Sequence, residues 1–148
     1  MKFSTKTRYG IRAMQEIGKY SLEGKPIFQK EIAKKQGISV KYLDHIISGL
    51  KSAGLVVNIR GKKSGYKITR NPSEITLLDI HNAFEPGICV IDCLAEGVEC
   101  SYDDNCAAQG FWGGLNNIVV EYFQSFTLQD LIDKQHLIDD DVASKVST

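Results

Sequence analysis

The chain has 148 residues, of which 43% are hydrophobic and 24% charged, and its formal net charge is zero. This length supports one compact domain, or one domain with an appended helical arm. The sequence has no apolar stretch of the kind found in a secretion signal, and none approaches the ~18 apolar residues of a membrane span. We therefore expect a cytoplasmic protein without a membrane partner.

The zero net charge hides a strong polarity along the sequence. Residues 1–71 hold sixteen of the eighteen Lys and Arg and only four acidic residues, so this part carries +12. Residues 72–148 hold two basic and fourteen acidic residues, so they carry −12. A basic segment of this size is typical of proteins that neutralise phosphates. The first half is therefore expected to face a polyanion.

The first two predicted elements are helices. Apolar residues from Tyr9 to Ile17 recur at helical spacing, and the pattern loosens at Gly18. Residues 28–36 predict a short second helix. It should end at Gly37, because glycine readily adopts the left-handed conformation that follows many helices.

A third helix and a hairpin follow. Ser39 is suited to cap a helix whose apolar stripe lies within residues 43–50. The spacing then changes to that of strands, in the β-branched run 55–59 and in residues 66–69. Between them, residues 61–65 form a basic turn that begins and ends with glycine.

Helix, tight turn, helix and basic hairpin make up a winged helix-turn-helix, so the predicted fold is mainly α with a small β-hairpin. Ala33 is small enough to let the two helices approach, Gly37 allows the bend, and Leu43 anchors the second helix to the core. The opposite face of this helix is then available to a DNA major groove. The candidate contacts on it are Lys41, Tyr42, Asp44, His45 and Ser48.

The turn of the hairpin adds a second candidate DNA contact. Arg60, Lys62 and Lys63 give it three cations, which suit the sugar-phosphate backbone, and an arginine at its base can enter a narrow minor groove. Alone, such a turn is as compatible with a solvated surface hairpin. Directly after a helix-turn-helix it is better interpreted as the wing of a protein that binds double-stranded DNA.

All four cysteines fall within residues 89–106. Cytosolic reductants disfavour structural disulfides, so metal binding or redox sensing is the better expectation. The window contains no C-x-x-C pair, which weakens a structural zinc site. An iron-sulfur cluster, a thiol/disulfide switch and inert or zinc-binding cysteines all remain open. No nucleophile elbow, phosphate loop or metalloprotease motif occurs, so we do not expect an enzyme.

The longest apolar stripe follows the cysteines. It predicts a helix that a partner subunit would bury, and therefore a homodimer. The acidic end of the chain offers nothing to pack and is expected to be flexible. The predicted division is a DNA-binding region at 1–71, a cysteine loop with the dimerisation helix at 72–138, and a flexible acidic tail at 139–148. The stripe consists of Phe111, Leu115, Ile118, Val119, Tyr122, Phe123 and Phe126.

Several segments together resemble the family of winged helix-turn-helix transcriptional regulators that includes IscR, CymR and NsrR. They are residues 1–10, 37–43, 54–56, 60–66, 75–80, the cysteine loop and 126–131. The resemblance implies a homodimeric DNA-binding regulator. By position, it implies base reading by Lys41, Asp44 and His45 and minor-groove insertion by Arg60.

The resemblance also implies a cofactor. Cys93, Cys100 and Cys106 are similar to the three cysteines that hold an iron-sulfur cluster in some members, and a 2Fe-2S cluster is favoured over a 4Fe-4S cluster. Where some members place a histidine as fourth ligand, this chain has Gln109. Where others place an acidic ligand, it has Arg8.

Cys89 is the candidate fourth ligand, because it adds a thiolate from the same loop. A ligand from the second subunit is the alternative. CymR-like members regulate without such a loop, so a thiol-switched or cluster-free regulator of cysteine metabolism also remains open. An iron-sulfur electron carrier is a remote alternative, which would leave the basic half unexplained.

Overall fold

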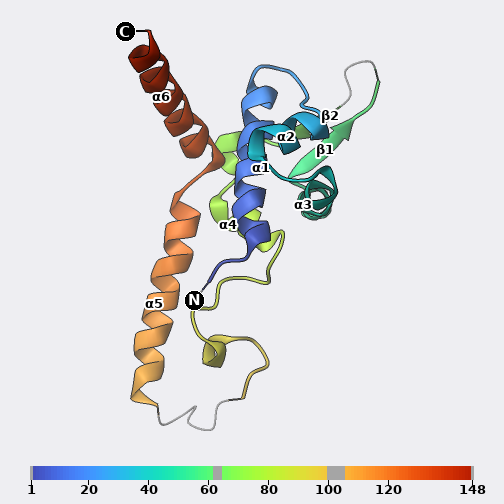
Figure 1. Ribbon diagram of the computed structural model, residues 1–148. Coiled ribbons are helices and arrows are strands. Elements are labelled where there is room, and N and C mark those ends of the chain that lie inside the picture. The colour runs from blue at the N-terminus through green and yellow to red at the C-terminus, as the bar shows by residue number, and fades with distance from the viewer. Residues whose placement is uncertain (1, 62–64, 100–105, 148) are drawn as a thin grey trace.

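The computed structural model describes residues 2–61, 65–99 and 106–147. A winged helix-turn-helix occupies the N-terminal part, and two long helices extend from it (Figure 1). The elements in chain order are α1 (Thr5–Leu22), α2 (Gln29–Gln36), α3 (Val40–Ser52), β1 (Val56–Ile59), β2 (Gly65–Ile68), η1 (Pro72–Glu74), α4 (Leu77–Asn82), η2 (Asp92–Leu94), α5 (Ala107–Ser125) and α6 (Leu128–Val146). The mainly α fold with one small hairpin is confirmed.

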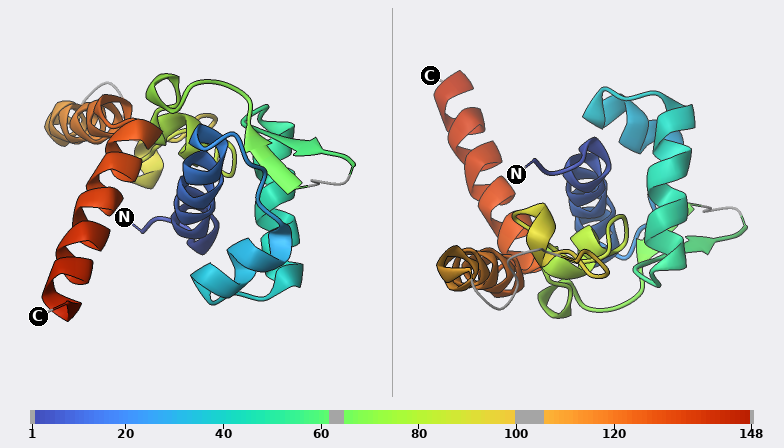
Figure 2. Two further views of the ribbon diagram at one scale, coloured as in Figure 1. Left: turned by 90° about the horizontal axis from the view of Figure 1, so that it is seen from above. Right: turned by 90° about the horizontal axis from the view of Figure 1, so that it is seen from below.

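Helix α1 lies at the centre of the molecule, with the hairpin on one side and α6 on the other (Figure 2). Ser4 caps it by accepting a hydrogen bond from the Thr7 amide, 3.1 Å away. Ala13, Met14 and Ile17 are fully buried. They share one hydrophobic core with side chains of the later elements, including Ile32, Leu43, Ile46, Leu50, Ile75, Ile80, Leu128 and Ile132. Residues from 1–71 and from 72–138 therefore contribute to the same core.

The helix-turn-helix forms as the sequence predicts. Gly37 follows α2 with φ of 64°, the left-handed conformation that allows the chain to turn. Ser39 caps α3 by accepting a hydrogen bond from the Tyr42 amide at 3.0 Å. Ala33 and Leu43 are both buried, so α2 and α3 pack through the small residue and the anchor that the sequence indicates.

The wing is an antiparallel hairpin, in which Val56 pairs with Ile68 and Ile59 with Gly65. The segment before α2 joins it, because Ile27 and Tyr66 exchange two backbone hydrogen bonds of 2.9 and 3.2 Å. Gly65 has φ of 141°, and a Cβ at this position would lie 2.6 Å from the Ile27 carbonyl oxygen. Only glycine fits this close backbone approach.

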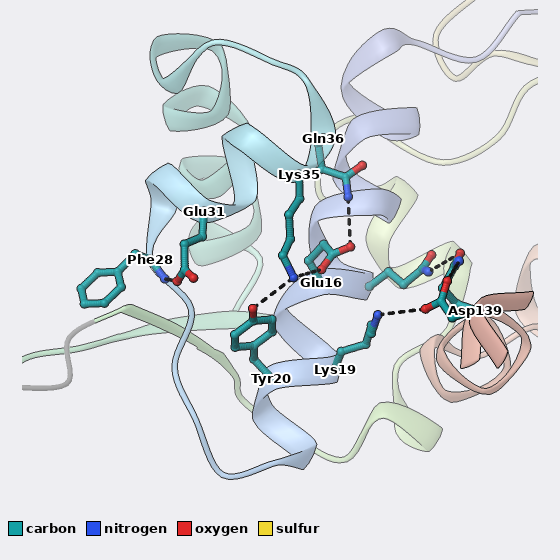
Figure 3. A network of polar contacts seen from close by, with 10 residues as sticks. Glu16, Lys19, Tyr20, Phe28, Glu31, Lys35, Gln36 and Asp139 are labelled. Carbon is teal, nitrogen blue, oxygen red and sulfur yellow. Dashed lines mark hydrogen bonds and ion pairs between the residues drawn. The ribbon is translucent and has the colours of Figure 1, made fainter. Parts of the chain in front are cut away.

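The sequence led us to expect that the first helix loosens at Gly18. In the structure, α1 instead continues to Leu22. Gly18 is buried inside α1, and a Cβ there would lie 2.8 Å from Ile132 Cδ1 of α6. The missing side chain thus lets α6 pack closely against α1. Farther along α6, Asp139 pairs with Lys19 at 3.5 Å, as Figure 3 shows.

The structure also differs from the expected tail. Residues 139–146 continue α6 as regular helix, instead of ending it near Asp139. Two hydrogen bonds of i,i+4 spacing support this extension, from Gln135 to Asp139 at 2.9 Å and from Lys145 to Asp141 at 2.8 Å. Residues 139–146 are therefore a solvated helix, on which the acidic side chains lie beside the exposed apolar Val142 and Val146.

Replacing Gly65 by Ala tests the contact between the wing and the segment before α2. We expect a lower free energy of unfolding, by about 1–3 kcal/mol for the backbone strain and more for the clash with Ile27. Denaturant unfolding of Gly61→Ala is the control, because Gly61 also has a positive φ, of 117°, but faces open space. Equal losses in the two variants would show that the clash contributes nothing.

Candidate nucleic-acid interface and cysteine loop

The outer face of α3 is polar and solvated. Its inner face buries Leu43, Ile46, Ile47 and Leu50, and this fixes the direction of the outer face. Lys41, Asp44, His45 and Ser48 are all exposed there. Tyr42 differs, because its ring is half-buried and meets the Tyr9 ring edge-on at a centroid distance of 5.8 Å. It offers a DNA partner less surface than its neighbours do.

Of the three wing cations, Arg60 is exposed immediately after β1. Lys62 and Lys63 lie outside the described residues. In the part of the chain that the structure describes, Arg60 forms no ion pair with a carboxylate. Its charge is therefore available to a phosphate or to a minor groove.

Two polar residues at this surface were missed from the sequence. Lys51 lines a groove between α3 and the wing together with Asp44 and Tyr66. Its spacing, three residues after Ser48, was the available signal. Gln29 at the start of α2 contacts both α3 and the wing, and nothing in the local sequence indicates this.

Not every basic residue of the N-terminal half faces outward. The Lys35 ammonium donates a hydrogen bond to the Tyr20 hydroxyl at 3.0 Å and lies 3.6 Å from the Glu16 carboxylate (Figure 3). The hydrogen bond to Tyr20 and the charge of Glu16 raise the pKa of Lys35. This cation joins α2 to α1, and it is less suited to phosphate than Lys41 or Arg60.

The cysteine loop lies far from the wing, beside α5 (Figure 1). Cys89, Cys93 and Cys106 are exposed free thiols, and Cys100 lies outside the described residues. Cys93 is in η2, and Cys106 immediately precedes α5. The Cys89 thiol donates a hydrogen bond to the Ile91 carbonyl at 2.8 Å.

The donor chemistry of this loop fits an iron-sulfur cluster, because such clusters are held by cysteine sulfur and the described cysteines are exposed. Within the described ranges, however, no three metal-binding side chains come together. Gln109 is exposed in the first turn of α5, and Arg8 is exposed on α1. A carboxamide is a weak neutral metal ligand, and a guanidinium is a cation that does not coordinate iron.

A buried histidine holds the start of the loop. His81 on α4 is only 1% exposed. Its Nε2 donates to the Gly87 carbonyl at 2.9 Å, since a carbonyl can only accept. In the neutral imidazole, Nδ1 then accepts from the Thr7 hydroxyl, 3.3 Å away, and that hydroxyl accepts from Ser4 at 3.2 Å. A hydrogen-bonded chain thus links the cap of α1 to the loop.

The helix-turn-helix, the paired hairpin and the unpaired cations define a winged-helix DNA-binding protein. None of the helices within the described residues is long and apolar enough to cross a membrane.

Residues 3–134 match the model of the Rrf2 family, described as an iron-dependent transcriptional regulator. The chain belongs to this family of DNA-binding transcriptional regulators, whose members are not enzymes.

Individual relatives agree with this membership. The chain is 31% identical to the HTH-type transcriptional regulator IscR of Photorhabdus laumondii over 140 residues, which cover 94% of this chain and 84% of that protein. Its structure is similar to CymR, the global cysteine regulator of B. subtilis, with a TM-score of 0.78, 36% identity, and coverage of 90% and 98% of the two chains. T. potens IscR has a TM-score of 0.74 and 30% identity, with coverage of 91% and 88%.

The exposed basic surface predicts strongly salt-dependent binding to duplex DNA. If about six phosphates are contacted, affinity should fall roughly 10³-fold between ~50 and ~200 mM salt, because released counterions dominate. Arg60→Ala should weaken binding and make it less salt-dependent, whereas Lys134→Ala in the acidic half is the control. Fluorescence anisotropy titrations measure both. An affinity unchanged across this salt range would contradict the phosphate contacts.

Proposed function

We propose that this protein is a homodimeric, cytoplasmic transcriptional regulator that senses iron-sulfur cluster or redox status through its cysteine loop. The observation that carries the proposal is the anchoring of this loop. It starts at the Gly87 carbonyl held by buried His81, and it ends at α5. A change in the loop is therefore applied to two structural elements at once.

The helix that carries His81, α4, is connected to the DNA-binding half by the packing of Phe84. Phe84 follows α4, and its ring lies between α1 and α3. A Cβ on Gly10 would approach Phe84 Cε2 to 2.3 Å, and one on Gly49 would approach Cε1 to 2.8 Å. Since packed interfaces shift as units, a displacement of α4 would be transmitted to the recognition helix.

Helix α5 supports the dimer. In the described structure, none of its residues is buried. The large apolar side chains of Phe111, Ile118 and Tyr122 are each more than 60% exposed. Exposed apolar stripes of this kind mark protein interaction sites. We propose that the second subunit buries this stripe, so that two recognition helices are held at a fixed spacing.

For DNA reading, we propose that Lys41, Asp44 and His45 contact base edges and that Arg60 enters the minor groove. The exposure of all four side chains supports this assignment. A carboxylate such as Asp44 can accept from the amino group of cytosine, and His45 can donate to a purine. Tyr42, Ser48, Lys62 and Lys63 are proposed to contact the DNA backbone.

For the cofactor, we propose a cluster held by Cys93, Cys100, Cys106 and Cys89, with 2Fe-2S favoured over 4Fe-4S. Bound there, it would supply a redox-active centre. Nearby acidic residues, among them Asp92, Glu96 and Glu99, place negative charge around the loop and would lower the reduction potential of a bound cluster.

A cluster-free regulator switched by thiols is the second candidate. One observation favours it: the structural similarity to CymR, described as a cysteine regulator. In that case Cys93 and Cys106, both exposed, are the candidate redox thiols.

Cysteine variants separate the two candidates. In protein purified without oxygen, Cys93→Ser, Cys100→Ser, Cys106→Ser and Cys89→Ser should each lose the visible chromophore, along with the iron and sulfide counted per chain. Gln109→Ala is the control and should retain them, because a carboxamide is a weak neutral ligand. Wild-type protein without iron would support the thiol-switched regulator. A full cluster in the Cys89→Ser variant would show that another residue is the fourth ligand.

A charge on the apolar stripe tests the dimer. Ile118→Asp should convert a dimer into a monomer, because an unpaired carboxylate cannot be buried at an apolar interface without a large penalty. Gln124→Asp, on another face of α5, should leave the dimer intact. Light scattering coupled to size-exclusion chromatography measures both masses. A dimeric Ile118→Asp variant would place the interface on a different surface.

A further inference from the structure

Gln29 occupies an unusual position at the DNA-facing surface. It is the first residue of α2, and its side chain bridges three elements. The Nε2 group donates to the Asp44 carboxylate and to the Val40 carbonyl of α3, the latter at 3.2 Å. The Oε1 atom accepts from the Tyr66 hydroxyl of β2 at 3.4 Å.

These contacts use both amide hydrogens of Gln29 and its carbonyl oxygen within the protein. Gln29 is therefore not free to read an adenine edge in the usual bidentate way. Asp44 in contrast is exposed, and one of its two carboxylate oxygens, Oδ1, is held by Gln29. A carboxylate held in one orientation presents its other oxygen in a defined direction.

The wing stabilises the same arrangement. Tyr66 is placed by its two backbone hydrogen bonds to Ile27, two residues before Gln29. Burial and the charge of Asp44 raise the pKa of Tyr66, so its hydroxyl stays protonated and remains a donor to Gln29. The side-chain amide of Gln29 thus contacts both Tyr66 of the wing strand and the Asp44 carboxylate of α3.

We propose that Gln29 is a positioning residue for sequence recognition, which fixes the Asp44 carboxylate relative to the wing and so determines how strictly Asp44 selects its base. The inference rests on the proposed base contact of Asp44. It adds a residue outside the recognition helix to the determinants of specificity, and it makes helix reading and wing placement interdependent.

A double-mutant cycle tests the inference with the full-length protein. A preferred duplex is first selected from a random pool, and affinities are then measured on it, on its single-base variants and on a random duplex. Gln29→Ala should reduce the preference at the position that Asp44→Ala also affects, by at least about fivefold. Affinity for the random duplex should not change.

In the Asp44→Ala background, Gln29→Ala should have little further effect, because both residues act through one carboxylate. Gln36→Ala is the matched control, since it removes a glutamine from the same helix whose amide bonds to Glu16 instead of α3. Gln29→Met keeps the side-chain length and should reproduce the shift if Gln29→Ala unfolds. Thermal melting verifies the fold of each variant.

The outcomes distinguish the two proposals. If Asp44→Ala alters base preference and the Gln29 variants do not, the positioning role is overturned while the base contact stands. Full additivity, or a shift at a different base position, would also overturn it by assigning Gln29 an independent contact. If Asp44→Ala alters no preference, the proposed base contact itself is wrong, and the positioning role is lost with it.

Discussion

Close packing around α1 is the constraint on which the rest of the structure depends. Ala13, Met14 and Ile17 are fully buried, and α2, α3, α4, α6 and β2 all contact α1. Small residues set the separations. The missing side chain of Gly18 leaves room for α6 to pack against α1. That of Gly10 leaves room for the Phe84 ring, which also contacts α3. Because such contacts leave no room for a shift of one partner alone, the recognition helix, the cysteine-loop anchor and α6 are mechanically connected through one helix.

Electrostatics and packing divide the basic residues into two groups. Lys19 and Lys35 pair with Asp139 and Glu16, so they join α1 to α6 and α2 to α1. Lys41 and Arg60 remain exposed at the DNA-facing surface. The sequence shows the excess of +12 but cannot separate these groups, since an ion pair depends on which helix lies opposite. The charge that is effective toward DNA is therefore smaller than the composition indicates.

The elements that sequence analysis predicted well are those decided by local physics. Gly37 turns the chain and Ser39 caps α3, and both effects operate within a few residues. The expectation of a flexible tail was wrong in its secondary structure, because hydrogen bonds between helix neighbours and the ion pair of Asp139 with Lys19 replace the apolar contacts that the segment lacks. The burial of His81 is not decided locally in this way, since its ring packs against Phe3 and Phe123, which are distant in sequence.

The sequence by itself determined the winged helix-turn-helix, the basic first half, the outward face of α3 and the grouping of four cysteines, because each is encoded by spacing or by local charge. The tertiary structure alone decided three other features. It brought Gln29 against Asp44 and Tyr66, joined His81 to Thr7 and Gly87, and placed Phe84 between α1 and α3. The physical reason is the same in each case: these contacts join segments far apart along the chain, and only the packing of the helices sets their distance.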